Sequence, residues 1–180
     1  MTTLDAPSYI LTTFTKGLTS LLHILRTAES HARQNNISFD DEYLPARLAA
    51  DMKPLSFQIQ NATNTIKLHL GRLRGEGYDV WEDDEMSLGE LYARIDRTRG
   101  LLRDFERGEM DGVRGRLERG EEVEMNWGSL KVKTQAGYGA LYHGIPNFFF
   151  HLQTAYAILR AKGVPLGKKD YIEEFYKDHV

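Results

Sequence analysis

The sequence of 180 residues contains no cysteine and only five prolines. The missing thiols exclude disulfides, thiolate metal ligands, iron–sulfur clusters and cysteine nucleophiles. An excess of charge of one sign is missing too, because 23 basic residues oppose 26 acidic residues and leave a net charge of −3. A nearly balanced charge provides no electrostatic attraction to nucleic acid or to a membrane surface. We therefore expect neither as a partner.

Long hydrophobic runs are also absent. The longest apolar stretch near the C-terminus is Phe148–Phe150, whereas a membrane-spanning helix needs roughly 20 apolar residues. The first residues lack the basic start and the apolar segment of a secretory signal. These absences predict a cytoplasmic protein. The length and the hydrophobic content of 41% predict a single folded domain over residues 1–180.

What the sequence does contain is apolar residues at helical spacing. From Ile10 to Ala32 they recur every three or four positions, as they do in three later segments. Pro54 lies inside the second pattern, so we expect either a kink there or a helix that begins only near Pro54. The four helices are predicted near residues 7–34, 45–74, 87–107 and 138–162.

Between the third and fourth helices the apolar period changes from about 3.6 to 2. Residues 108–120 are charged and interrupted by glycine, which is typical of a loop with at most a helical turn. Residues 121–134 then alternate between polar and apolar on both sides of Asn126–Ser129, which predicts a short β-hairpin. The sequence therefore predicts an all-α four-helix bundle with a hairpin inserted before the last helix.

Polar residues on the last predicted helix are candidates for chemistry. His143, Asn147 and His151 are spaced by four and form one row beside the apolar residues. His151 lies nearest to the apolar residues and is the best candidate for a catalytic base or a metal ligand. Asparagine is a poor ligand for transition metals, and His143 lies two turns, roughly 12 Å, from His151. One metal ion cannot bridge that distance.

The second predicted helix carries a matching row of Asp51, Gln58, Thr65 and His69. In a bundle, such rows come close together, so we expect Asp51 or Gln58 to face His151. Asp51 would then be the catalytic partner of His151. The same polar residues also suit a structural role, in which they only pack and hydrogen-bond.

Further candidates lie outside these pairs. Ligand-binding residues are predicted to be His143, Asn147, Gln58 and Tyr142. Three aromatic residues are expected to lie off the apolar face of the last helix, as a dimer interface or a pocket wall: Tyr138, Tyr142 and Phe149. The arginines of the third helix are interleaved with acidic residues and predict a solvated face: Arg94, Arg97, Arg99, Arg103 and Arg107.

Two segments resemble signatures of an uncharacterised family within the DinB/YfiT-like helical-bundle superfamily. They are Leu44–Gln60 in the second helix and Ile145–Lys168 in and after the last helix. The resemblance implies a four-helix bundle, often dimeric, in a superfamily that includes thiol-dependent transferases and hydrolases. Those enzymes hold a divalent metal, zinc or nickel, with three histidines. Two of these ligands are four residues apart on the last helix, where this chain has Asn147 and His151, so the histidine triad is incomplete.

Two functions are consistent with these residues. One is an enzyme, or a degenerate metalloenzyme, that acts on a small molecule in the bundle interior through His151. The other is a non-catalytic bundle that binds a small ligand or associates with itself as a homodimer.

Overall fold

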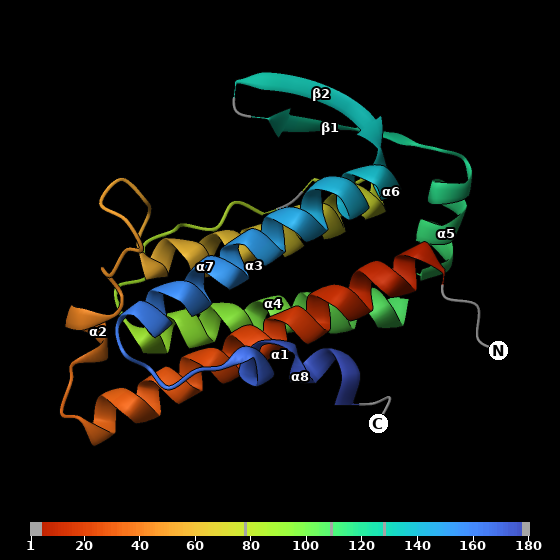
Figure 1. The fold of residues 1–180 in the computed structure, drawn as a ribbon. Coiled ribbons are helices and arrows are strands. Elements are labelled where there is room, and N and C mark those ends of the chain that lie inside the picture. The colour runs from red at the N-terminus through yellow and green to blue at the C-terminus, as the bar shows by residue number, and fades with distance from the viewer. Residues whose placement is uncertain (1–4, 78, 109, 128, 178–180) are drawn as a thin grey trace.

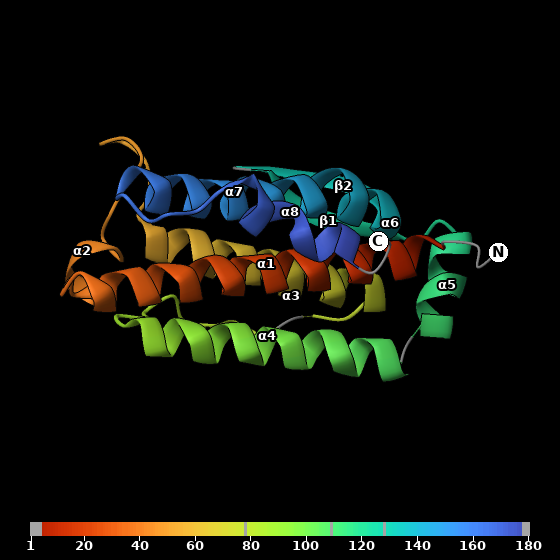
Figure 2. The ribbon, with the colours of Figure 1, turned by 60° about the horizontal axis from the view of Figure 1, so that its bottom comes forward.

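Four long helices pack side by side around an apolar core in a computed structural model of the chain, which describes residues 5–77, 79–108, 110–127 and 129–177 (Figure 1). They are α1 (Ala6–Gln34), α3 (Leu55–Arg74), α4 (Leu88–Gly108) and α7 (Ile145–Ala161). Both α1 and α3 contact α4 and α7, and Figure 2 shows α4 and α7 on opposite sides of that pair. The predicted four-helix bundle is confirmed.

Shorter elements complete the chain. They are α2 (Phe39–Glu42), α5 (Met110–Glu118), β1 (Glu122–Trp127), β2 (Leu130–Gln135), α6 (Ala136–Gly139), the π-helical turn η1 (Ala140–Gly144) and α8 (Lys168–Tyr176). The sequence did not predict α8, which packs against α1. Among the helices of the described segments, none is both long and apolar enough to cross a membrane.

The start of α1 lies where the sequence places it. Asp5 precedes the helix, and its carboxylate accepts a hydrogen bond from the backbone amide of Ser8 over 2.8 Å. Arg114 also donates to this carboxylate, over 2.7 Å, and the hydrogen bonds from these two residues lower the pKa of Asp5 to about 2. The cap thus fixes the start of α1 and ties it to α5.

The second long helix is shorter than the segment 45–74 because it begins at Leu55. Pro54 occupies the position before the first helical residue. Proline has no backbone amide hydrogen to donate and disfavours the helical conformation in the residue before it, so the helix does not extend back beyond Pro54. The preceding residues form turns, in which the Arg47 guanidinium donates to the carbonyl of Met52 over 2.6 Å. Of the two expectations for Pro54, the later start is correct.

The prediction of a loop with at most a helical turn over residues 108–120 underestimates the helix, because α5 occupies most of this segment. Val113 is buried in the core, and Leu117 packs partly against it. Arg114 pairs with Asp5 at the start of α1. These tertiary contacts stabilise a glycine-containing helix that would be marginal by itself.

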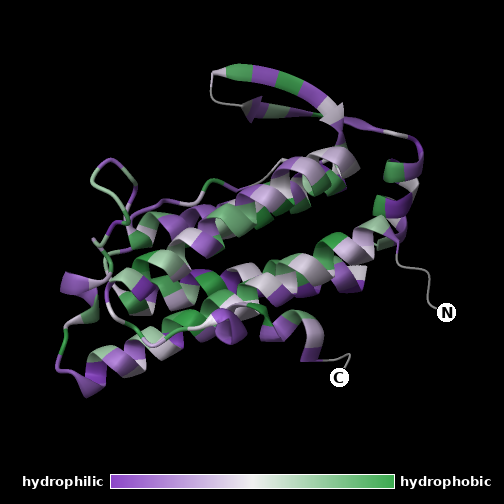
Figure 3. Cartoon of the chain, in the orientation of Figure 1, coloured by the Kyte–Doolittle hydropathy of each residue, from purple (hydrophilic) through white to green (hydrophobic). Residues whose placement is uncertain are grey.

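The predicted hairpin is confirmed, although Gly128 of its expected turn lies outside the described residues. β1 and β2 pair antiparallel from Glu122 with Gln135 to Trp127 with Leu130. Side chains alternate in polarity along β2, as Figure 3 shows. The hairpin packs against α6, where Met125 is buried beside Gly139.

Candidate functional site

Three polar contacts join α3 to the helical stretch formed by η1 and α7. Both elements contribute three side chains, and the contacts follow one another along the antiparallel helices. We call this set the polar row: Gln58, Thr65, His69, His143, Asn147 and His151.

The first contact of the polar row joins His151 to Gln58. The amide nitrogen of Gln58 donates to the carbonyl of Lys53 over 3.0 Å, so its oxygen faces His151 and accepts from Nδ1 over 2.8 Å. The rings of Phe57 and Phe150 lie edge-on to the imidazole. Burial lowers the pKa of His151 to about 4, so the ring is neutral at pH 7.

Asp51 does not take the place that we predicted for it. It lies exposed in the turn before α3, because the helix that would have carried it begins only at Leu55. Gln58 therefore pairs with His151, and the expected carboxylate–histidine pair is not formed. The second alternative for the partner of His151 is the correct one.

The second contact brings two histidines together. His69 Nε2 and His143 Nδ1 lie 3.3 Å apart, and an Arg72 guanidinium nitrogen lies 3.5 Å from the same Nε2. With Nε2 accepting, the proton of His69 is on Nδ1, which is buried without a hydrogen-bond partner. Burial, together with the smaller effects of Arg72 and His143, lowers the pKa of His69 to about 3. Burial and Arg72 also lower the pKa of His143.

The π-helical turn η1 explains why the sequence did not predict this pair. A π-helix has more residues per turn than an α-helix, so the spacing by four does not give the direction of His143. Gly144 lies directly against the imidazole of His69, and a Cβ there would come 2.7 Å from the ring. A glycine beside His143 was the signal in the sequence for this close approach.

The polar row does not fit a three-histidine metal site. A separation of 3.3 Å matches two nitrogen ligands of a tetrahedral zinc ion, which are about 3.3 Å apart. The third position is Asn147, whose amide donates to the Thr65 hydroxyl over 2.7 Å, and Arg72 would repel a divalent cation bound at His69. Within the part of the chain that the structure describes, no three His, Asp or Glu side chains form a metal-binding group.

The aromatic residues of α6 to α7 lie partly as predicted. Tyr142 is 74% exposed and stacks on Tyr138, with ring centroids 5.6 Å apart. Phe149 was expected outside the core, but it packs partly buried against Phe175 of α8. Phe150 is exposed instead.

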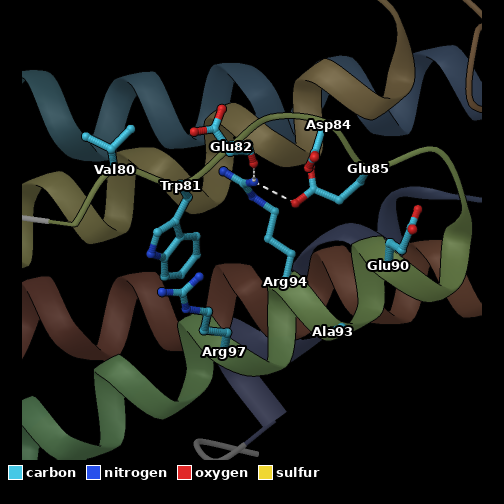
Figure 4. A pocket seen from close by; sticks show the side chains of 9 residues that line it. All are labelled: Val80, Trp81, Glu82, Asp84, Glu85, Glu90, Ala93, Arg94 and Arg97. Atoms are coloured by element: carbon cyan, nitrogen blue, oxygen red, sulfur yellow. Dashed lines mark hydrogen bonds and ion pairs between the residues drawn. The ribbon is translucent and has the colours of Figure 1, made fainter.

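A separate hollow of about 590 Å³ lies between α4 and the acidic segment before it (Figure 4). Figure 4 shows Trp81 above Arg97, whose guanidinium lies 4.1 Å from the ring centroid. Arg94 was predicted on a solvated face, but it is buried. Its five N–H groups are all used, by Thr63, Asn64, Glu82, Asp83 and Glu85. Arg94 therefore anchors the acidic segment and has no donor left for a ligand.

Comparison with known proteins finds a family model and a solved structure that are similar to this chain. A family model described as a domain of unknown function (DUF1993) matches residues 8–172. A crystal structure of a DinB family member protein from Shewanella denitrificans is similar, with a TM-score of 0.76 and 32% sequence identity over 90% of this chain and 88% of that chain. No curated protein matches the sequence.

Proposed function

This chain belongs to the DUF1993 family of unknown function, as its resemblance to uncharacterised DinB-like proteins predicted, and we propose that it is a non-catalytic helical bundle that associates with itself. The observation that carries the proposal is an uncharged aromatic surface on α6, η1 and α7. We call it the aromatic face: Tyr138, Tyr142, Pro146 and Phe150. A cytoplasmic location and a single domain over residues 1–180 remain predictions.

The interior supports a binding protein more than an enzyme. His151, the predicted base, is buried and already bonded to Gln58, and a base must come within hydrogen-bond reach of its substrate. Asn147 is likewise bonded to Thr65. Two contacts of the polar row, Gln58 with His151 and Thr65 with Asn147, are therefore hydrogen bonds made between α3 and α7 themselves, which suits a role in setting helix register.

The aromatic face, by contrast, is open to solvent. Tyr138, Tyr142 and Phe150 are 53%, 74% and 58% exposed. No member is charged, although charged residues make up 27% of the chain. Exposed aromatic residues are characteristic of the centre of a protein interface, where charged residues are depleted.

A second copy of the chain is the partner that suits this surface. A two-fold axis places the same patch on both subunits, and an uncharged face meets its own copy without charge repulsion. A small molecule needs enclosure on several sides, which side chains more than half exposed do not provide. Further rings pack against the aromatic face. The ring of Phe150 contacts the imidazole of His151, which in turn contacts the ring of Phe57.

Light scattering coupled to size exclusion tests the proposal. We expect a dimer for the native chain and a monomer for the double variant Tyr142→Ser, Phe150→Ser, with unchanged helical circular dichroism. Met86→Ser is the matched control, because Met86 is 80% exposed but lies before α4. A native chain that stays monomeric at its highest soluble concentration would overturn self-association.

A further inference from the structure

A cavity of about 400 Å³ lies where the ends of α3 and α4 meet α5, away from both the polar row and the aromatic face. Arginine is the commonest residue in its lining, which consists of Arg74, Gly108, Gly112, Val113, Arg116 and Arg119. We propose that this cavity, the arginine pocket, binds the phosphate group of a small molecule. The inference is independent of self-association.

The charges of the arginine pocket favour an anion. Arg116 and Arg119 share a single carboxylate, that of Glu121, with a distance of 2.6 Å to each guanidinium. The single negative charge of Glu121 therefore neutralises only one of these two positive charges. In addition, the Nε atom of Arg116 is buried without a hydrogen-bond partner. A buried donor without an acceptor is costly, and an anion oxygen would supply the acceptor.

The position of Arg116 is prepared by the backbone. Gly75 ends α3 with a φ of 75°, in the left-handed region that favours glycine. The Arg116 guanidinium lies where a Cβ of residue 75 would be. Glycine at this position therefore does two things: it ends the helix, and it leaves room for a guanidinium at the edge of the pocket.

Two other glycines leave the backbone beside the arginines uncovered. A Cβ at Gly108 or Gly112 would meet no atom within 4 Å, so packing does not require glycine at either position. Gly112 lies inside α5, where glycine costs helix stability. Bare backbone next to guanidinium groups allows the close approach that phosphate oxygens need.

A structural role for the same arginines makes a different prediction. Arg74 lies in the last turn of α3 and Arg116 touches the residue that ends it, where cations stabilise a helix through its dipole. Removal of an arginine would then lower stability by the same amount with or without phosphate.

Thermal unfolding in inorganic phosphate, against chloride at equal ionic strength, separates the two roles. We expect the native Tm to rise by about 5–10 °C at phosphate concentrations about 100 times Kd, and acetate to have no such effect. Arg119→Gln should abolish the rise. Arg103→Gln, an exposed arginine of α4 outside the pocket, is the matched control and should keep it.

Gly112→Ala provides a variant whose folding is not in question. Alanine is the better helix former, so we expect a higher Tm in chloride together with a smaller rise in phosphate. A phosphate response that Arg119→Gln and Gly112→Ala leave intact would overturn the proposal, as would an equal response to acetate. Absence of any response in the native chain would overturn it as well.

Discussion

The Nε atom of Arg94 donates to the hydroxyl of Thr63 over 2.7 Å and so joins α4 to α3 inside the bundle. The two remaining nitrogens of the guanidinium hold the acidic segment on the other side, through Asp83 and Glu85 at 2.7 Å each. One buried side chain thus connects three parts of the chain. The planar fork of arginine is needed for this arrangement, because the five donors point in fixed directions.

We expect Arg94→Lys to lower the free energy of unfolding by about 2–4 kcal/mol, although the charge is kept, because a lysine cannot replace five directed donors. Urea unfolding followed by circular dichroism measures the loss. Arg99→Lys is the control, since Arg99 makes a single ion pair at the surface, with Asp96, and should change stability by less than about 0.5 kcal/mol. Equal effects of the two variants would refute the anchoring role.

Acid should destabilise the bundle below about pH 6.5. His69 and His151 have pKa values of about 3 and about 4 in the folded chain, against about 6.5 when unfolded. The unfolded chain therefore binds more protons as the pH falls from 6.5, and stability decreases. We expect a loss of about 1–2 kcal/mol for each histidine between pH 7 and pH 5.

The variant His69→Gln tests the origin of this loss, because glutamine does not titrate. Its free energy of unfolding should depend less on pH than that of the native chain between pH 7 and pH 5. His23→Gln is the control, since His23 is exposed and pairs with Asp170. If His69→Gln keeps the full native pH dependence, burial of this imidazole is not the cause of the loss of stability in acid.

Close packing of α1 on α7 depends on Gly17. A Cβ at this position would clash with the ring of Phe148, which is fully buried. We expect Gly17→Ala to cost about 1–3 kcal/mol in a denaturant titration, because the core has no room to yield. Gly100→Ala in α4 should instead stabilise by up to about 1 kcal/mol, since the nearest atom is 4.0 Å away. A stabilised Gly17→Ala chain would contradict the packing seen here.

Metal analysis tests whether the histidines of the polar row hold a metal ion. Protein purified without chelator should hold well under one equivalent of zinc or nickel, because Asn147 and Arg72 do not suit a third ligand position. His151→Ala should leave the metal content unchanged. One full equivalent that disappears in both His69→Ala and His143→Ala would show that the two histidines hold a metal after all.

The long helices could be predicted because their signals are local. Apolar spacing and the Asp5 cap act within a few residues, and the structure contains both. At the start of α4, Ser87 and Glu90 likewise form a capping box, in which each side chain accepts a hydrogen bond from the other residue's backbone amide. The short helix α5 could not be predicted in this way. Its stability comes from the burial of Val113 and from Arg114, which pairs with a residue more than 100 positions away.

In the candidate site, too, only the contacts with local signals could be predicted. Matching polar rows on two helices predicted Asp51 or Gln58 as the partner of His151, and the structure contains the second of these pairs. The partnership of His69 with His143 was not predicted, because it depends on a π-helical turn that no spacing rule anticipates. The burial of Arg94 depends on an acidic segment that folds back over α4, and composition alone places arginine at the surface.

The two-stranded hairpin has a consequence for behaviour in concentrated solution. Both of its strands are edge strands, and unpaired edges invite further strands to add and build fibrils. Glu122 and Glu124 lie along one edge, and Lys131 and Lys133 lie along the other. When the same edge of two molecules meets, these like charges repel each other, so the hairpin disfavours pairing of β1 with β1 or of β2 with β2. The chain remains free to associate through other surfaces.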